Sequence, residues 1–79
     1  MGYPLGSLAA QINRTVELCF SDGEIVHARL LAIDPDDHED VTYEVVRVVK
    51  PVCPPARGTQ VGATVVAELH QLDRWRLIE

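Results

Sequence analysis

The chain has little of what marks the specialised classes of small protein. Its 79 residues include two cysteines, Cys19 and Cys53, whereas a small secreted domain held together by disulfides usually carries more. Structural zinc sites are commonly built from closely spaced cysteine pairs, and neither cysteine has such a neighbour. We therefore expect two free thiols, no bound metal, no cofactor and a cytoplasmic location.

Long apolar runs and an excess of positive charge are also missing. No segment approaches the roughly 20 apolar residues that cross a bilayer, and the first residues lack the basic and apolar blocks of a signal peptide. Lysine and arginine total 7 against 12 acidic residues, which gives a net charge of −5. Because phosphate neutralisation dominates affinity for nucleic acids, this charge balance argues against a nucleic-acid partner. Because long apolar runs are missing, we also expect no membrane partner.

The strongest positive signal is a hairpin pattern that begins at Thr15. From Thr15 to Phe20 apolar and polar residues alternate with a period of two, which is typical of a half-buried strand. The dipeptide Asp22-Gly23 follows, and it favours a tight turn because glycine tolerates a positive φ. The next segment, from Ile25 to about Ile33, changes its apolar face midway. This change predicts a bend or bulge of the kind that small barrels need.

The rest of the chain completes a small β domain. Residues 3–12 predict a short helix, because their apolar positions recur on one helical face. Three further strands are predicted at 41–49, 64–67 and 74–78, with a helical turn at 68–72. The charged segment 34–40 and the proline- and glycine-containing segment 50–63 are predicted loops. We expect one domain, residues 1–79, that is mainly β: an SH3-like, five-stranded antiparallel barrel with a short N-terminal helix.

The first half of this pattern resembles the Sm/Lsm (Sm-like) family over roughly residues 4–49. The matching positions of the first family motif are Val16 and Leu18 on either side of Glu17, the turn glycine Gly23, Leu30 and Asp34, with Val41 at an apolar position just beyond; Ala28 stands where the family prefers glycine. The resemblance implies an Sm-like barrel whose copies associate by pairing the fourth strand of one with the fifth strand of the next. It does not extend to the RNA pocket, because His38 stands at the family's asparagine position. The late Ile-Arg-Gly motif is also absent, and Arg57-Gly58 is the only Arg-Gly pair.

The two last predicted strands are short and carry apolar residues that a small core does not fully cover. Such strands are candidates for edge-to-edge association. The residues concerned are Val65, Val66, Leu77 and Ile78. We therefore predict a homo-oligomer, and the leading functional hypothesis is a non-catalytic, Sm-like binding or assembly module.

An Lsm-type RNA- or nucleic-acid-binding protein is the alternative. Its candidate contacts are His38, Arg57, Arg74, Trp75 and Arg76, and Arg29 and Arg47 would join Arg57 and Trp75 on one face. A tryptophan beside arginines can stack on bases. In the competing interpretation, Trp75 fills the core of a small barrel and the two neighbouring arginines lie on a solvated face.

Catalysis and metal binding have weak support. Three histidines, His27, His38 and His70, show no spacing to a nucleophile or second acid that indicates a catalytic site. The acidic segment 34–40 does not follow the spacing of a calcium loop and has no glycine for its sharp turn. We predict no catalytic, cofactor-binding or metal-binding residues, and no enzymatic activity.

Overall fold

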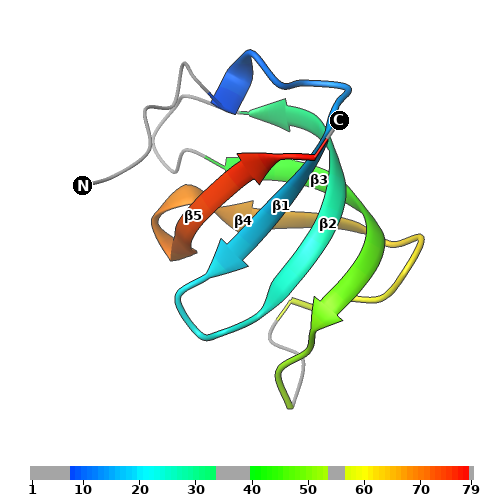
Figure 1. The fold of residues 1–79 in the computed structure, drawn as a ribbon, viewed down its shortest axis with the longest axis vertical. Coiled ribbons are helices and arrows are strands. Elements are labelled where there is room, and N and C mark those ends of the chain that lie inside the picture. The colour runs from blue at the N-terminus through cyan, green and yellow to red at the C-terminus, as the bar shows by residue number, and fades with distance from the viewer. Residues whose placement is uncertain (1–7, 34–39, 54–56, 79) are drawn as a thin grey trace.

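The computed structural model describes residues 8–33, 40–53 and 57–78, and they form one antiparallel sheet of five strands (Figure 1). The strands pair in the order β4-β3-β2-β1-β5, so the first strand lies between the second and the last. A short 3-10 turn, η1, joins β4 to β5. The elements are β1 (Thr15–Phe20), β2 (Ile25–Ile33), β3 (Asp40–Lys50), β4 (Thr64–Glu68), η1 (Leu69–Gln71) and β5 (Leu72–Leu77).

The predicted hairpin between β1 and β2 is confirmed. Gly23 has a φ of 99°, the left-handed conformation that glycine adopts without a steric penalty. The turn is closed by the Phe20 amide, which donates to the Glu24 carbonyl at 2.8 Å. The Asp22 carboxylate accepts from the Glu24 amide at 3.1 Å, as short acidic side chains commonly do in turns.

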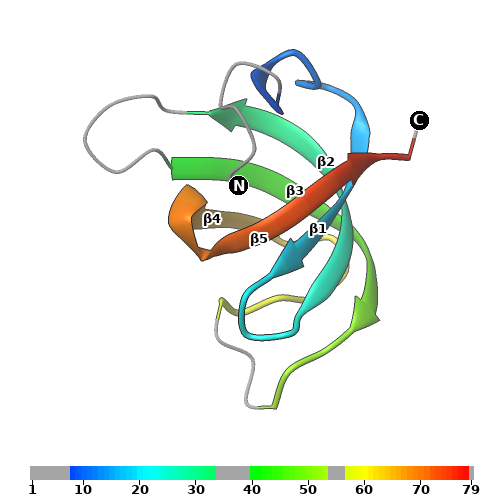
Figure 2. The ribbon, with the colours of Figure 1, turned by 60° about the vertical axis from the view of Figure 1, so that its left-hand side comes forward.

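The predicted irregularity of the second strand is also present. The ladder between β2 and β3 shifts register at three places, between Ile25 and Val26, between His27 and Ala28, and between Leu30 and Ala32. Such shifts bend a strand and increase its twist. The long β2 and β3 strands are therefore strongly curved, as Figure 2 shows.

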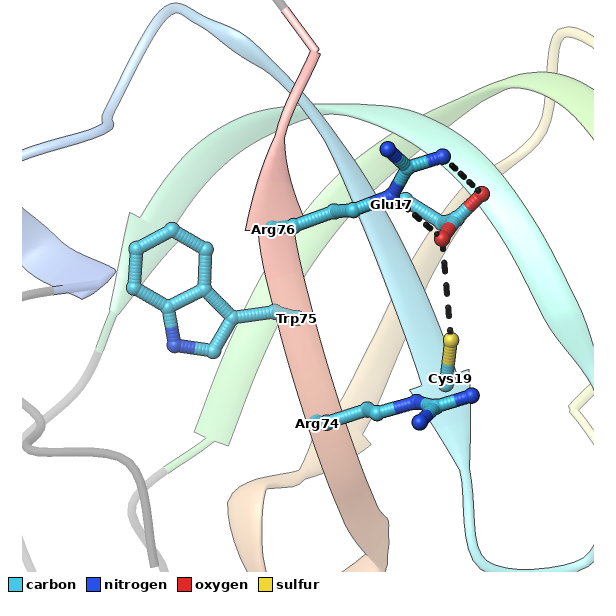
Figure 3. A pocket seen from close by; sticks show the side chains of 5 residues that line it. All are labelled: Glu17, Cys19, Arg74, Trp75 and Arg76. Carbon is cyan, nitrogen blue, oxygen red and sulfur yellow. Dashed lines mark hydrogen bonds and ion pairs between the residues drawn. The ribbon is translucent and has the colours of Figure 1, made fainter.

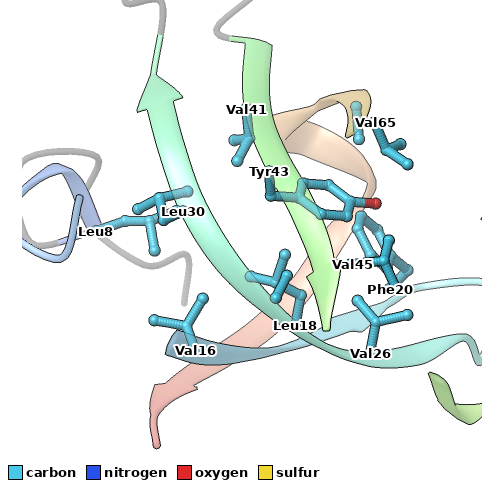
Figure 4. Close-up of a cluster of buried hydrophobic side chains, with 12 residues drawn as sticks. Leu8, Val16, Leu18, Phe20, Val26, Leu30, Val41, Tyr43, Val45 and Val65 are labelled. Atoms are coloured by element: carbon cyan, nitrogen blue, oxygen red, sulfur yellow. The ribbon is translucent and has the colours of Figure 1, made fainter. Parts of the chain in front are cut away.

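The concave side of the curled sheet holds the core. Alternate residues of β1, β2 and β3 point into it, and residues of β4 close it from the far end (Figure 4). Tyr43 is fully buried and lies near Phe20, with the ring centroids 6.1 Å apart. The buried cluster consists of Leu8, Val16, Leu18, Phe20, Val26, Ala28, Leu30, Val41, Tyr43, Val45, Val65 and Ala67.

The expectation of a closed barrel is wrong. In the described part of the chain, β4 and β5 share no ladder, although they stand at the two ends of the strand order. The chain turns through η1 and β5 then pairs with β1 instead of folding back onto β4. Among the residues that the structure describes, each of these two strands pairs with one other strand, and the sheet is open.

The predicted N-terminal helix over 3–12 is not seen as an element. Residues 3–7 lie outside the described residues, and from residue 8 only Leu8 and Ala9 are helical before a series of turns. The chain leaves the helical path because it joins β2: the Asn13 amide donates to the Leu30 carbonyl at 2.7 Å. Leu8 is buried against the core, so one part of the predicted apolar face is in place.

Candidate functional site

A hollow of about 340 Å³ lies on the convex side of the sheet, where β5 runs beside β1. Its lining residues are Glu17, Cys19, Arg74, Trp75 and Arg76. In Figure 3 the two arginines point toward the β1 residues, whereas the Trp75 side chain points to the opposite side of β5. The hollow therefore has the two arginines of β5 along one side and the carboxylate of Glu17 and the thiol of Cys19 along the other.

The strand pairing explains why these residues meet. Glu17 and Cys19 point away from the core because the alternate residues of β1 fill it. In the register between β1 and β5, Glu17 lies opposite Arg76 and Cys19 lies opposite Arg74. Side chains at paired positions share a face of the sheet. Residues of β1 and β5 therefore lie side by side at this site although they are far apart in the sequence.

Glu17 is held by a basic side chain on each side. Arg76 donates from Nε to Glu17 Oε1 at 2.8 Å and from Nη2 to Oε2 at 3.3 Å. His27 on β2 places Nε2 3.0 Å from Glu17 Oε2. The hydrogen bonds from Arg76, and then the one with His27, lower the pKa of Glu17 to about 2. The carboxylate therefore stays charged throughout the physiological range.

This arrangement makes folding stability depend on pH in a defined window. The pKa of Glu17 is lower in the folded protein than in the unfolded chain, so its ionisation stabilises the fold. That contribution is complete above about pH 4.5 and is lost as the pH falls toward 2. We expect Glu17→Gln to flatten the decline of the free energy of unfolding across this window, measured by urea titration at several pH values. An unchanged slope would contradict the assignment, and Glu44→Gln, at a more exposed acid, is the control.

The convex face continues across β2 and β3 with further positive groups. Arg47 is paired with His27, and Lys50 with Ile25, in the β2–β3 ladder. Arg29 lies opposite Glu44 and donates to its Oε1 at 3.4 Å. The convex face therefore gathers positive groups on β5, β2 and β3, although the chain as a whole is acidic.

The predicted nucleic-acid contacts do not all meet on this face. Arg74 and Arg76 flank the hollow, but the Trp75 side chain packs against the core, as the competing interpretation expected. Arg57 lies elsewhere, beside the β1–β2 turn. His38 lies outside the described residues.

Arg57 forms a buried cluster that the sequence did not indicate. Its Nε donates to Glu24 Oε1 at 3.1 Å and its Nη2 to Asp22 Oδ2 at 2.8 Å. The guanidinium carbon lies 4.0 Å from the centre of the Phe20 ring, in cation–π geometry. The side chains of Glu24 and Arg57 are only 1% and 7% exposed. Arg57 therefore fastens the segment before β4 to the hairpin turn and does not present its charge to a partner.

Glu24 of this cluster accepts one more hydrogen bond and also affects the pKa of a core tyrosine. Thr59 Oγ1 donates a second hydrogen bond to Glu24 Oε1, at 3.2 Å. Burial, and then the negative charge of Glu24, raise the pKa of Tyr43 to about 12. No local pattern in the sequence joins Glu24 to Arg57, because the two residues come from segments that only the folded sheet brings together.

The predicted edge residues fall into two groups. Val66 on β4 is 59% exposed, and Leu77 and Ile78 at the end of β5 are 42% and 39% exposed. Val65 points the other way and belongs to the core. Three of the four predicted residues thus present apolar surface beside the unpaired edges of the sheet.

The described residues show no other chemical centre. Both cysteines are free; Cys19 is buried and Cys53 is exposed. No group of three or more potential metal ligands occurs among the residues that the structure describes, and most of the acidic segment 34–40 lies outside them. No helix in the described ranges has the length and apolar character required to span a bilayer.

Comparison of the chain with models of known protein families, with curated proteins and with solved structures found no match in any of the three.

Proposed function

We propose that this protein is a non-catalytic, Sm-like assembly module. Copies associate when the free edge of β4 in one pairs with the free edge of β5 in the next. The observation that carries the proposal is the strand order β4-β3-β2-β1-β5, in which no other strand of the described residues pairs with the outer edges of β4 and β5. Unpaired strand edges present rows of backbone donors and acceptors to another chain.

The surface around these edges supports the same function. Val66 on one edge strand, and Leu77 and Ile78 at the other, expose apolar area that a second strand would cover. Pairing of two different edges is a head-to-tail contact, which closes into a ring or continues as a filament. The resemblance of the first half of the chain to Sm-like proteins implies the same pairing of fourth and fifth strands.

The test is the native mass in solution, measured by light scattering after gel filtration at two protein concentrations. We expect the wild-type protein to elute as a multiple of 8.8 kDa. Val66→Lys should elute as the monomer, because a lysine on an edge strand opposes pairing. Circular dichroism of each variant checks that the sheet is retained.

The matched control is Val61→Lys. Val61 is also more than half exposed, but it precedes β4 and lies off both edge strands. This variant should keep the wild-type mass. A monomeric wild-type protein at both concentrations, or an assembled Val66→Lys variant, would refute the proposal.

A further inference from the structure

The free edge of β4 has an acidic end. Glu68, Val66 and Thr64 point to the side opposite the buried Val65 and Ala67. Glu68 lies opposite Asp40 in the β3–β4 ladder, so these two acids stand side by side. Within the described residues Glu68 contacts His70, with Oε2 3.2 Å from the histidine Nε2, and its side chain is 47% exposed.

The free edge of β5 carries the opposite charge. Arg74 and Arg76 are exposed on the convex side, on the opposite side of β5 from the Trp75 side chain (Figure 3). Arg76 keeps its bonds to Glu17, but a guanidinium has five N–H donors, so it can bind a second acceptor. Asp73, the acid of β5, lies at the irregularity of the β1–β5 ladder, before Arg74.

One register brings the two edges together with matched charges. When β4 pairs antiparallel with β5 of another copy and Val66 lies opposite Arg76, the whole of β4, residues 64–68, faces residues 74–78. The alternation of both strands then places Glu68 opposite Arg74 on the convex face. Shifting the pairing by one residue would turn the convex side of one strand to the core side of the other.

We propose that Glu68 of one copy and Arg74 of the next form a cross-strand ion pair that sets this register and selects β4 as the strand that β5 accepts. This inference rests on the proposed assembly and adds to it the residues that determine which edges join. Opposite charges at directly opposed positions stabilise a strand pair, and like charges there destabilise it. The arginine-flanked hollow is thus one half of a contact that the acidic end of β4 completes.

The experiment compares charge reversals by sedimentation equilibrium at low and high salt. Glu68→Arg and Arg74→Glu should each weaken assembly about tenfold or more, because each places like charges opposite one another. The double variant restores an opposed pair and should assemble within a few-fold of the wild type. The wild-type assembly should weaken as salt is raised. Arg47→Glu reverses an exposed positive charge on β3, which is not an edge strand, and should leave assembly unchanged.

The possible results separate this inference from the proposal on which it rests. If the wild-type protein assembles and Val66→Lys disrupts it, but neither charge reversal changes the dissociation constant, the edges pair without the Glu68–Arg74 contact and the inference is refuted alone. If the loss in the free energy of assembly in the double variant equals the sum of the losses in the two single variants, the two residues do not face each other. If the wild-type protein is monomeric under all conditions, both proposals fall.

Discussion

Replacing Arg57 with methionine is expected to lower the free energy of unfolding by about 3 kcal/mol, a large part of the roughly 5 kcal/mol that stabilises many small domains. Methionine keeps an apolar side chain over the Phe20 ring, but the Glu24 carboxylate then remains almost fully buried without its cation. A buried charge that loses its partner keeps its desolvation cost and has nothing to offset it. Urea denaturation at one low protein concentration measures the loss.

The control is the double variant Glu24→Gln with Arg57→Met. Glutamine removes the unpaired negative charge of Glu24 and keeps a carbonyl oxygen that can accept a hydrogen bond from Thr59. We expect the double variant to recover more than half of the stability that the single variant loses. If the double variant is as unstable as Arg57→Met alone, the cost does not come from the unpaired carboxylate, and the assigned role of the cluster is wrong.

Leu30→Ala is expected to cost about 3 kcal/mol, within the range that deletion of a buried leucine side chain usually shows. Leu30 has no exposed surface, and it lies next to Leu8 in the core (Figure 4). Its backbone also binds the incoming N-terminal segment, since its amide donates to the Arg14 carbonyl at 3.0 Å. The loss of the side chain therefore opens a cavity beneath the point where this segment joins the sheet.

The adjacent Leu31→Ala is the matched control for this prediction. It removes the same atoms from a leucine that is only partly buried, so it should cost less than half as much. Urea denaturation of both variants gives the comparison, with the free energy of unfolding expected to depend on urea concentration with the same slope in each. Equal losses at the two positions would mean that Leu30 is not a central core residue.

Local patterns in the sequence predicted the strands well because those patterns reflect burial directly. Val41, Tyr43 and Val45 alternate along β3, and all three are buried. Asp22-Gly23 predicted the turn because the left-handed conformation at Gly23 is a local requirement. The sequence also favoured Trp75 as a residue of the core, and its side chain is partly buried and packs against the core.

Features that depend on distant segments were not predictable in this way. Whether β5 pairs with β4 or with β1 is decided by competing tertiary contacts, so the closed barrel was a wrong prediction. The Arg57–Glu24 pair joins a loop to a turn, and neither residue carries a local signal of its partner. The Glu17–Arg76 pair likewise exists only through the ladder of β1 with β5. Ion pairs between distant segments could therefore be identified only from the structure.

The position of β1 inside the sheet has a consequence for how the protein is made. During synthesis β1, β2 and β3 emerge first and can form a three-stranded meander. One side of β1 then stays open until β5 has left the ribosome, because Val16 pairs with Leu77 near the other end of the described chain. A nascent chain that stalls before residue 72 leaves one edge of β1 unpaired and its apolar residues open to neighbouring chains, and such an edge invites aggregation. Completion of β5 is thus the step of translation that protects β1.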